Sequence, residues 1–153
     1  MAEIEVPSLH NEKRLTFRLL SYWNRIRGER SMPLLRDIAI YEIQELWHFT
    51  FTIDVRDRTN PVFQYFGSEL RVIFHEDPSG SNVLDALNDV VLNNTIGGYV
   101  QCVEKKEPTM EAASFECDGK EFRYRTLCVP FSEDGETVDY IVGTTNYKIF
   151  DLA

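Results

Sequence analysis

The sequence predicts a single α+β domain on the basis of three observations. The chain has 153 residues, of which 43% are hydrophobic, and a chain of this length can bury a core without a disulfide or a metal ion. An amphipathic helical pattern near the start gives way to residues that alternate with the period of a β-strand. Two Asp-Gly dipeptides near the end favour tight antiparallel hairpins. Helices followed by an antiparallel sheet are typical of the α+β class.

The first element is predicted to be an amphipathic helix over Asn11–Arg27, which Gly28 ends. Apolar residues recur along one side of this segment at helical spacing, and they are Leu15, Phe17, Leu19, Leu20, Trp23 and Ile26. We expect Leu15, Leu19 and Trp23 to form an interface. This stripe can cover the outer face of the chain's own sheet, or it can pair with a second copy in a homodimer.

A second, shorter helix is expected over Asp37–Leu46. Residues 1–46 are then a helical extension that precedes the main domain at 47–153, and the two form one structural unit. The formal net charge of −9 is unevenly spread, since residues 1–58 hold nine basic and nine acidic side chains whereas the rest hold seven basic and 16 acidic ones.

The helical segment 11–30 has a net charge of +4. It can therefore meet an acidic partner, a membrane surface or the acidic part of its own chain. The overall acidity argues against a non-specific nucleic-acid surface, because phosphate binding depends on clustered Lys and Arg. No apolar run approaches the roughly 18 residues of a membrane span, and the first residues lack the apolar core of a secretory signal. We expect a cytoplasmic protein.

The middle of the chain contains the clearest strand signal, the alternation of apolar and polar residues over 47–55. The Gly97-Gly98 pair interrupts a later helical pattern, and it indicates either a kink or a place where another group packs close to the backbone. The expected elements are, in order, strands over 47–55 and 62–66, short helices over 68–74 and 82–87, and a longer helix over 88–104.

The C-terminal part is predicted to be a three-stranded meander closed by Asp118-Gly119 and Asp134-Gly135. Two-residue turns at these dipeptides predict the pairs Cys117–Lys120, Phe115–Phe122, Phe131–Val138 and Cys128–Ile141. Alternation along the strands then assigns one face to Phe122, Tyr124, Thr126, Cys128, Ile141, Gly143 and Thr145, and the other to Leu127, Val129, Phe131, Val138 and Val142. Both faces are apolar near their middle, so we expect this sheet to be covered on both sides.

This order of elements resembles the PAS fold, in which a five-stranded antiparallel sheet carries short helices and one longer helix on one face. From about Leu19 onward, the chain resembles the single-domain PAS family typical of alphaproteobacteria. The motifs that carry the resemblance are Tyr22-Trp23, Arg27-Gly28, Pro33, Arg36-Asp37-Ile38, Phe66-Gly67-Ser68-Glu69-Leu70, Phe74, Asp77-Pro78-Ser79-Gly80, Val129-Pro130-Phe131, Asp134-Gly135 and Ile141-Val142-Gly143. Tyr41 stands where that family often has a proline, and His75 where it often has a glycine.

The resemblance implies a sensory or regulatory module that acts through contacts with an unidentified signalling protein. It also implies an interior cavity, onto which Thr145, Phe51 and Ile53 face in ligand-binding members. With strand alternation added, the expected ligand-binding residues are Phe51, Ile53, Phe122, Tyr124, Thr126, Cys128, Ile141 and Thr145. A small hydrophobic or aromatic ligand would suit this lining. The alternative is an interaction protein whose side chains fill the interior and leave no ligand site.

Standard enzyme signatures are absent from the sequence, and we expect no enzyme activity and no metal site. A less favoured alternative is a small enzyme that uses the cavity, with Glu69, Glu76 or Asp77 as suspected acids. We expect that no cofactor is required. A lone His48 or His75 is a weak candidate for a haem ligand.

Two further sequence features bear on cofactors. The stretch Asn82-Val83-Leu84 lacks the cysteine of flavin-binding photoreceptors. The three histidines, His10, His48 and His75, are scattered over the N-terminal tail, a strand and a loop, so a metal site would require the fold to bring them together. Cys102, Cys117 and Cys128 match neither a metal knuckle nor a redox pair, so we expect them to act as small buried hydrophobes.

Overall fold

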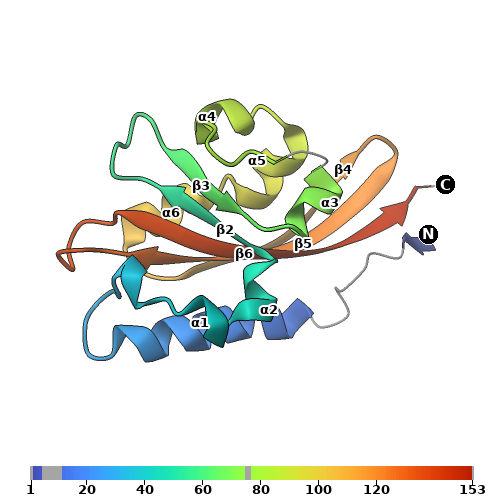
Figure 1. The fold of residues 1–153 in the computed structure, drawn as a ribbon. Coiled ribbons are helices and arrows are strands. Elements are labelled where there is room, and N and C mark those ends of the chain that lie inside the picture. The colour runs from blue at the N-terminus through green and yellow to red at the C-terminus, as the bar shows by residue number, and fades with distance from the viewer. Residues whose placement is uncertain (1, 5–11, 75–76, 153) are drawn as a thin grey trace.

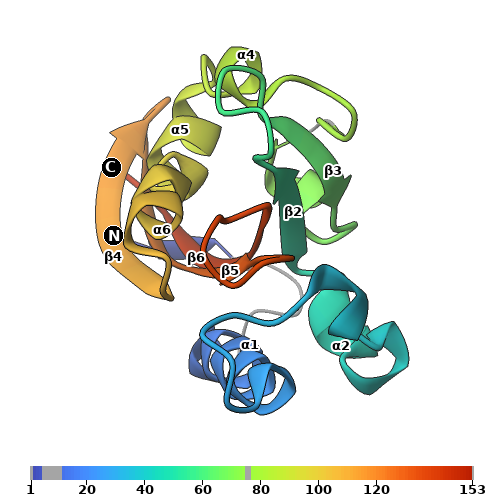
Figure 2. The ribbon, with the colours of Figure 1, turned by 90° about the vertical axis from the view of Figure 1, so that its left-hand side faces the viewer.

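The structure, a computed structural model that describes residues 2–4, 12–74 and 77–152, is organised around one antiparallel sheet. The strands follow the order β3-β2-β6-β5-β4, and the short β1 pairs with the far end of β6. The sheet curves around a group of short helices, with β3 and β4 at its two sides (Figure 2). The strands are β1 (Ala2–Ile4), β2 (Thr50–Asp54), β3 (Val62–Phe66), β4 (Thr109–Cys117), β5 (Lys120–Phe131) and β6 (Tyr140–Asp151).

Helices cover both faces of the sheet. The N-terminal helix α1 and the short α2 lie on the outer face, and the helices from α3 to α6 lie on the inner face (Figure 1). The helices are α1 (Glu12–Arg27), α2 (Gln44–Trp47), α3 (Leu70–Phe74), α4 (Val83–Ala86), α5 (Val90–Ile96) and α6 (Tyr99–Lys105), with 3₁₀ turns at Leu35–Asp37 and Ile40–Glu42. No helix in the described part of the chain is both long and apolar enough to cross a membrane.

The predicted helix over 37–46 is wrong, since this segment forms two 3₁₀ turns followed by α2. Two side chains hold it in this form. The hydroxyl of Tyr22 on α1 accepts a hydrogen bond of 2.8 Å from the Ala39 amide, and Arg30, which follows α1, donates to Asp37 at 2.8 Å. Because α2 ends at Trp47, the following strand begins at Thr50 rather than at residue 47.

The predicted long helix over 88–104 is interrupted at Gly97-Gly98, as one interpretation of the glycine pair anticipated. Gly97 caps the C-terminus of α5, and Gly98 is the N-cap of α6. The predicted long helix is therefore replaced by two short helices, α5 and α6, separated by the two glycines.

The two hairpins differ in how well the sequence predicted them. The first has the predicted register, with Phe115 opposite Phe122. The second is shifted by two residues, so that Cys128 pairs with Gly143 instead of Ile141. The carboxylate of Asp134 accepts hydrogen bonds of 2.8 Å from the backbone amides of residues 137 and 136. These bonds stabilise a longer loop and lower the pKa of Asp134 to about 2. A shift of two keeps every side chain on its predicted face.

The apolar stripe of α1 packs against the outer face of β5 and β6. Leu15, Leu19 and Trp23 are 6%, 2% and 4% exposed. The Trp23 indole N–H donates a 2.7 Å hydrogen bond to the backbone carbonyl of Pro130 on β5. Of the two roles that the sequence left open for this stripe, covering its own sheet is the one seen in the single chain. A homodimer through the same residues would require α1 to leave that sheet.

Two basic residues of α1, Arg18 and Arg25, pair with the segment that follows the helix rather than with the acidic part of the chain. Arg18 lies 3.5 Å from Glu45, and Arg25 lies 2.9 Å from Glu42. These side chains are largely exposed, and exposed ion pairs contribute at most about 1 kcal/mol each. Apolar packing therefore dominates the attachment of α1.

Replacing Leu19 with alanine is expected to lower the free energy of unfolding by about 2–5 kcal/mol, because it removes a buried side chain from the helix–sheet contact. The matched control is Phe17→Ala on the same helix, where the side chain is 68% exposed, and its effect should stay within about 0.5 kcal/mol. Urea denaturation followed by circular dichroism measures both. Equal effects of the two substitutions would contradict the docked position of α1.

Candidate functional site

The interior that the sequence left open as a possible cavity is occupied by the ring of Phe51. This side chain is fully buried on β2, directly opposite Gly143 on β6. A Cβ atom at Gly143 would lie 2.2 Å from the ring carbon Cζ of Phe51. The glycine is thus needed because an aromatic ring lies against the backbone at this point.

The eight predicted ligand-binding residues divide into two groups. Phe51, Ile53 and Ile141 are fully buried in the hydrophobic core, and Phe122 stacks on Phe115 with ring centroids 5.1 Å apart. The other four lie at or next to a small pocket on the inner face, and they are Tyr124, Thr126, Cys128 and Thr145.

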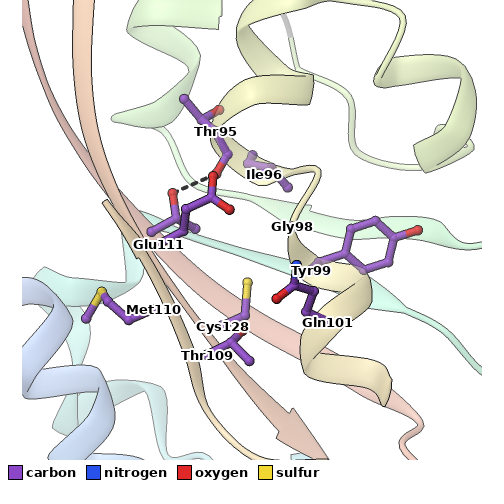
Figure 3. Close-up of a pocket in the computed structure, with 10 residues that line it drawn as sticks. Thr95, Ile96, Gly98, Tyr99, Gln101, Thr109, Met110, Glu111 and Cys128 are labelled. Carbon is purple, nitrogen blue, oxygen red and sulfur yellow. Dashed lines mark hydrogen bonds between the residues drawn. The ribbon is translucent and has the colours of Figure 1, made fainter. Parts of the chain in front are cut away.

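This pocket lies between the inner face of β4 and β5 and the junction of α5 with α6, and its volume is about 90 Å³ (Figure 3). The sulfur of Cys128 and the carboxylate of Glu111 point into the space, whereas the side chain of Met110 points away from it. Thr126 and Cys128 are the predicted ligand-binding residues among its lining. The full lining is Thr95, Ile96, Gly98, Tyr99, Gln101, Thr109, Met110, Glu111, Thr126 and Cys128.

A chain of hydroxyl groups connects the sheet to α5 at the back of the pocket. The Thr126 hydroxyl donates a 2.6 Å hydrogen bond to the backbone carbonyl of Thr95. The hydroxyl oxygens of Thr126 and Thr145 lie 2.7 Å apart. Since Thr126 has one proton and uses it for Thr95, the Thr145 hydroxyl donates to Thr126. These two predicted polar contacts for a ligand are therefore already satisfied within the protein.

The mouth of the pocket holds a carboxylate that the sequence analysis did not single out. The Tyr124 hydroxyl donates a hydrogen bond to Glu111. A Cβ atom at Gly98 would lie 3.1 Å from the other Glu111 oxygen, so the glycine at the start of α6 leaves room for this carboxylate. Burial and then the hydrogen bond to Glu111 raise the pKa of Tyr124 well above its ordinary value.

Two features of the sequence indicated this part of the pocket. The register of the first hairpin, continued back along the strand, places Glu111 opposite Thr126 on the inner face. The Gly97-Gly98 pair suggested a close approach to the backbone, which Glu111 makes at Gly98. The contributions of Thr95, Tyr99 and Gln101 depend on how α5 and α6 sit on the sheet, and no local pattern encodes that packing.

Two of the three cysteines are buried beside the pocket. Burial raises the pKa of the Cys102 thiol to about 12, and it raises that of Cys128 well above its ordinary value. Both groups are therefore neutral thiols at physiological pH, which makes them poor nucleophiles. Cys117 at the β4–β5 turn is half-buried.

Of the acids suspected from the sequence, Asp77 accepts hydrogen bonds of 3.0 and 2.6 Å from the backbone amide and the hydroxyl of Ser79. The carboxyl groups of Asp54, Asp57, Asp77 and Asp134 have lowered pKa values, in each case mainly because of local hydrogen bonds. Within residues 2–4, 12–74 and 77–152, no three His, Cys, Asp or Glu side chains are grouped so that they could hold a metal ion.

The structure describes only some of the histidines and acids that the sequence analysis suggested. His48 is exposed, and its ring nitrogen Nδ1 lies 3.2 Å from the Ser68 hydroxyl. His10, His75 and Glu76 lie outside the described residues.

A second, open groove of about 450 Å³ lies on the outer face, over β2 and β3. Trp47 and Tyr65 stack at its wall with ring centroids 5.0 Å apart. A bulge in β3 places Gln64 beside Tyr65 in the groove. Leu35, Ile38, Ile40 and Thr52 complete its lining.

A known protein family matches most of the chain. A family model described as a PAS domain matches residues 11–146. The search of curated proteins found no match.

Three solved structures show similarity at low sequence identity. The N-terminal domain of a diguanylate cyclase with a PAS/PAC sensor from Marinobacter aquaeolei is 17% identical, with a TM-score of 0.44 over 67% of this chain and 92% of that chain. An RNA-binding light-oxygen-voltage receptor is 15% identical, with a TM-score of 0.41 over 67% and 28%. A sensory box sensor histidine kinase from Vibrio cholerae is 15% identical, with a TM-score of 0.38 over 74% and 88%.

Replacing Gly143 with alanine is expected to lower the free energy of unfolding by about 1–3 kcal/mol, because the new methyl group meets the Phe51 ring. The same change in a Phe51→Leu background should cost less, since the smaller side chain frees space. A double-mutant cycle of chemical denaturation measures the coupling. Strict additivity would contradict the account of a filled interior.

Replacing Glu111 with glutamine is expected to lower the pKa of Tyr124, since it removes the carboxylate whose hydrogen bond and charge favour the neutral phenol. The measurement is an alkaline titration of tyrosinate absorbance, with Tyr124→Phe to identify the signal. Glu116→Gln on the same strand is the control and should leave the titration unchanged. An unchanged titration in Glu111→Gln would contradict the contact.

Proposed function

The chain belongs to the PAS domain family, and from that premise we propose that it is a sensory or regulatory module that acts on another protein through direct contact. The family model extends over residues 11–146, which include α1. The aspartates with lowered pKa values form hydrogen bonds to neighbouring residues of the chain, which supports a non-catalytic role. The three cysteines are free thiols, and free thiols are typical of a reducing compartment such as the cytoplasm.

The ligand that we propose for this module is small and polar rather than apolar or aromatic. A cavity of about 150 Å³ accommodates benzene, and a water molecule takes up about 30 Å³ of liquid. The pocket beside β4 has about 90 Å³, so a ligand of a few heavy atoms fits its size. The observation that carries this proposal is Glu111 at the mouth, because a carboxylate accepts up to about four hydrogen bonds and Tyr124 supplies one.

A second candidate function is a pure interaction protein without a ligand. Two observations favour it: the Phe51 ring lies against Gly143, and the hydroxyl groups of Thr126 and Thr145 are satisfied within the protein. In this case the inner face is a rigid core, and the contact surface alone carries the function.

Native mass spectrometry combined with thermal-shift assays distinguishes these candidates. We expect small compounds with hydrogen-bond donors, such as ammonium and methylamine salts, to raise the melting temperature of the wild-type protein. Glu111→Gln should abolish this shift, and the matched Glu116→Gln should retain it. Indole serves as the aromatic probe and is expected to have no effect.

Two results would contradict the ligand proposal. One is a shift by amines that Glu111→Gln leaves intact, because the carboxylate would then play no part. The other is no bound mass and no shift with any compound, which would favour the interaction protein with a filled core.

A further inference from the structure

The two edges of the sheet differ in how well they are protected. At the β3 edge, the backbone of Phe63 forms hydrogen bonds of 3.0 and 2.7 Å with Ser81 and Gly80. The Arg71 guanidinium caps the carbonyl of Phe66 with two bonds of 3.1 Å. A bulge in β3 further disturbs this edge. Coverage of this kind prevents an edge strand from pairing with another chain.

The β4 edge has none of these protections in the described structure. β4 forms the outer margin of the sheet (Figure 2), and its nine residues pair with β5 in an unbroken register. The strand contains no Lys and no Pro, and its centre consists of the small exposed residues Ala112, Ala113 and Ser114. A long, regular edge strand with small side chains is the kind of strand that accepts a further strand.

The tight turn after β4 determines which backbone groups point outward. Asp118 and Gly119 have φ values of 51° and 73°, as a two-residue type I′ turn requires, so the flanking pair of Cys117 and Lys120 is hydrogen-bonded. Alternate residues of β4 then direct their N–H and C=O groups away from β5. These outward-facing residues are Met110, Ala112, Ser114 and Glu116, and no hydrogen bond to their outward groups is present within the described chain.

We propose that β4 pairs with β4 of a second copy, antiparallel about a two-fold axis at Ala113, to join two sheets into one. Ala113 is the middle of Thr109–Cys117, so this register overlaps the full length of both strands. Each outward-facing residue then meets an outward-facing residue of the other copy. All of their backbone groups gain partners.

The charges on β4 suit this register. It places Glu116 opposite Met110 and Glu111 opposite Phe115 of the other copy, so no carboxylate faces another. A shift of the axis to residue 111 or 116 would set identical glutamates against each other, which is destabilising.

The ends of the strand also favour the full overlap. A shift of the axis to residue 112 would bring Pro108, which has no N–H, opposite Glu116. A shift to residue 114 would bring the Asp118 turn opposite Met110. In the register about Ala113, β4 meets its own copy without a pair of like charges and without mismatched ends, which supports a second copy as the occupant of the edge.

Net charge opposes this contact, since each copy carries −9. Pairing is therefore expected to be weak at low ionic strength and to strengthen as salt screens the repulsion. This dimer does not depend on the proposed ligand, although Thr109 and Glu111 of β4 also line the pocket. A failure of ligand binding and a failure of pairing are separate outcomes.

Disulfide trapping tests the register. In a Cys117→Ser background, oxidised glutathione should convert the Ala113→Cys variant to a covalent dimer. The two Cα atoms of a non-hydrogen-bonded antiparallel pair lie about 4.5 Å apart, which is within the Cα–Cα range of a disulfide. The matched controls are Ala112→Cys and Ser114→Cys, which are also exposed positions but would face a different residue of the other copy. Each control alone should give at least tenfold less covalent dimer. Equal yields from all three variants, or no dimer from Ala113→Cys, would overturn the proposal.

Sedimentation equilibrium tests the wild-type chain without any cysteine substitution. We expect a concentration-dependent dimer that is promoted by salt and lost in Ser114→Pro. Proline at this position removes an outward N–H and leaves the ladder with β5 intact, which an unchanged circular dichroism spectrum verifies. A wild-type protein that stays monomeric at millimolar concentration in high salt, or a dimer that Ser114→Pro leaves intact, would contradict the proposal.

Discussion

The structure depends on one constraint, which is that the central strands β5 and β6 are apolar on both faces. Val129 and Val142 point to the outer face, and Cys128 and Ile141 point to the inner face, and all four are buried. A sheet of this kind is stable only when both faces are covered. The helix α1 covers the outer face through its apolar stripe, and the short helices with Phe51 fill the inner face. The stability of the sheet therefore requires both α1 on the outer face and the packed inner face.

The filled interior determines where chemistry can occur. The Phe51 ring occupies the space that a side chain at Gly143 would otherwise need, so the centre of the inner face is packed. Room remains at the side, where Gly98 allows Glu111 to approach the start of α6. The proposed ligand site and the free β4 edge therefore share one strand.

Local patterns predicted the elements and faces better than the lengths of loops and helices. The type I′ turn at Asp118-Gly119 depends on its own two residues, and its register was predicted correctly. The second hairpin was wrong by two residues because the Asp134 side chain stabilises a longer loop. The cavity was beyond prediction for a different reason: strand alternation shows that Phe51 points inward, but not whether its ring lines a cavity or fills it.

The most direct test of the account is the exchange rate of the Trp23 indole proton, measured by NMR at increasing dilution. The account predicts one slowly exchanging indole signal, because Trp23 is buried and donates to the Pro130 carbonyl within the same chain. The indole of the half-buried Trp47 should exchange faster and serves as an internal reference. Protection of Trp23 that persists on dilution supports the account. Fast exchange, or protection that disappears on dilution, would show that α1 does not cover its own sheet.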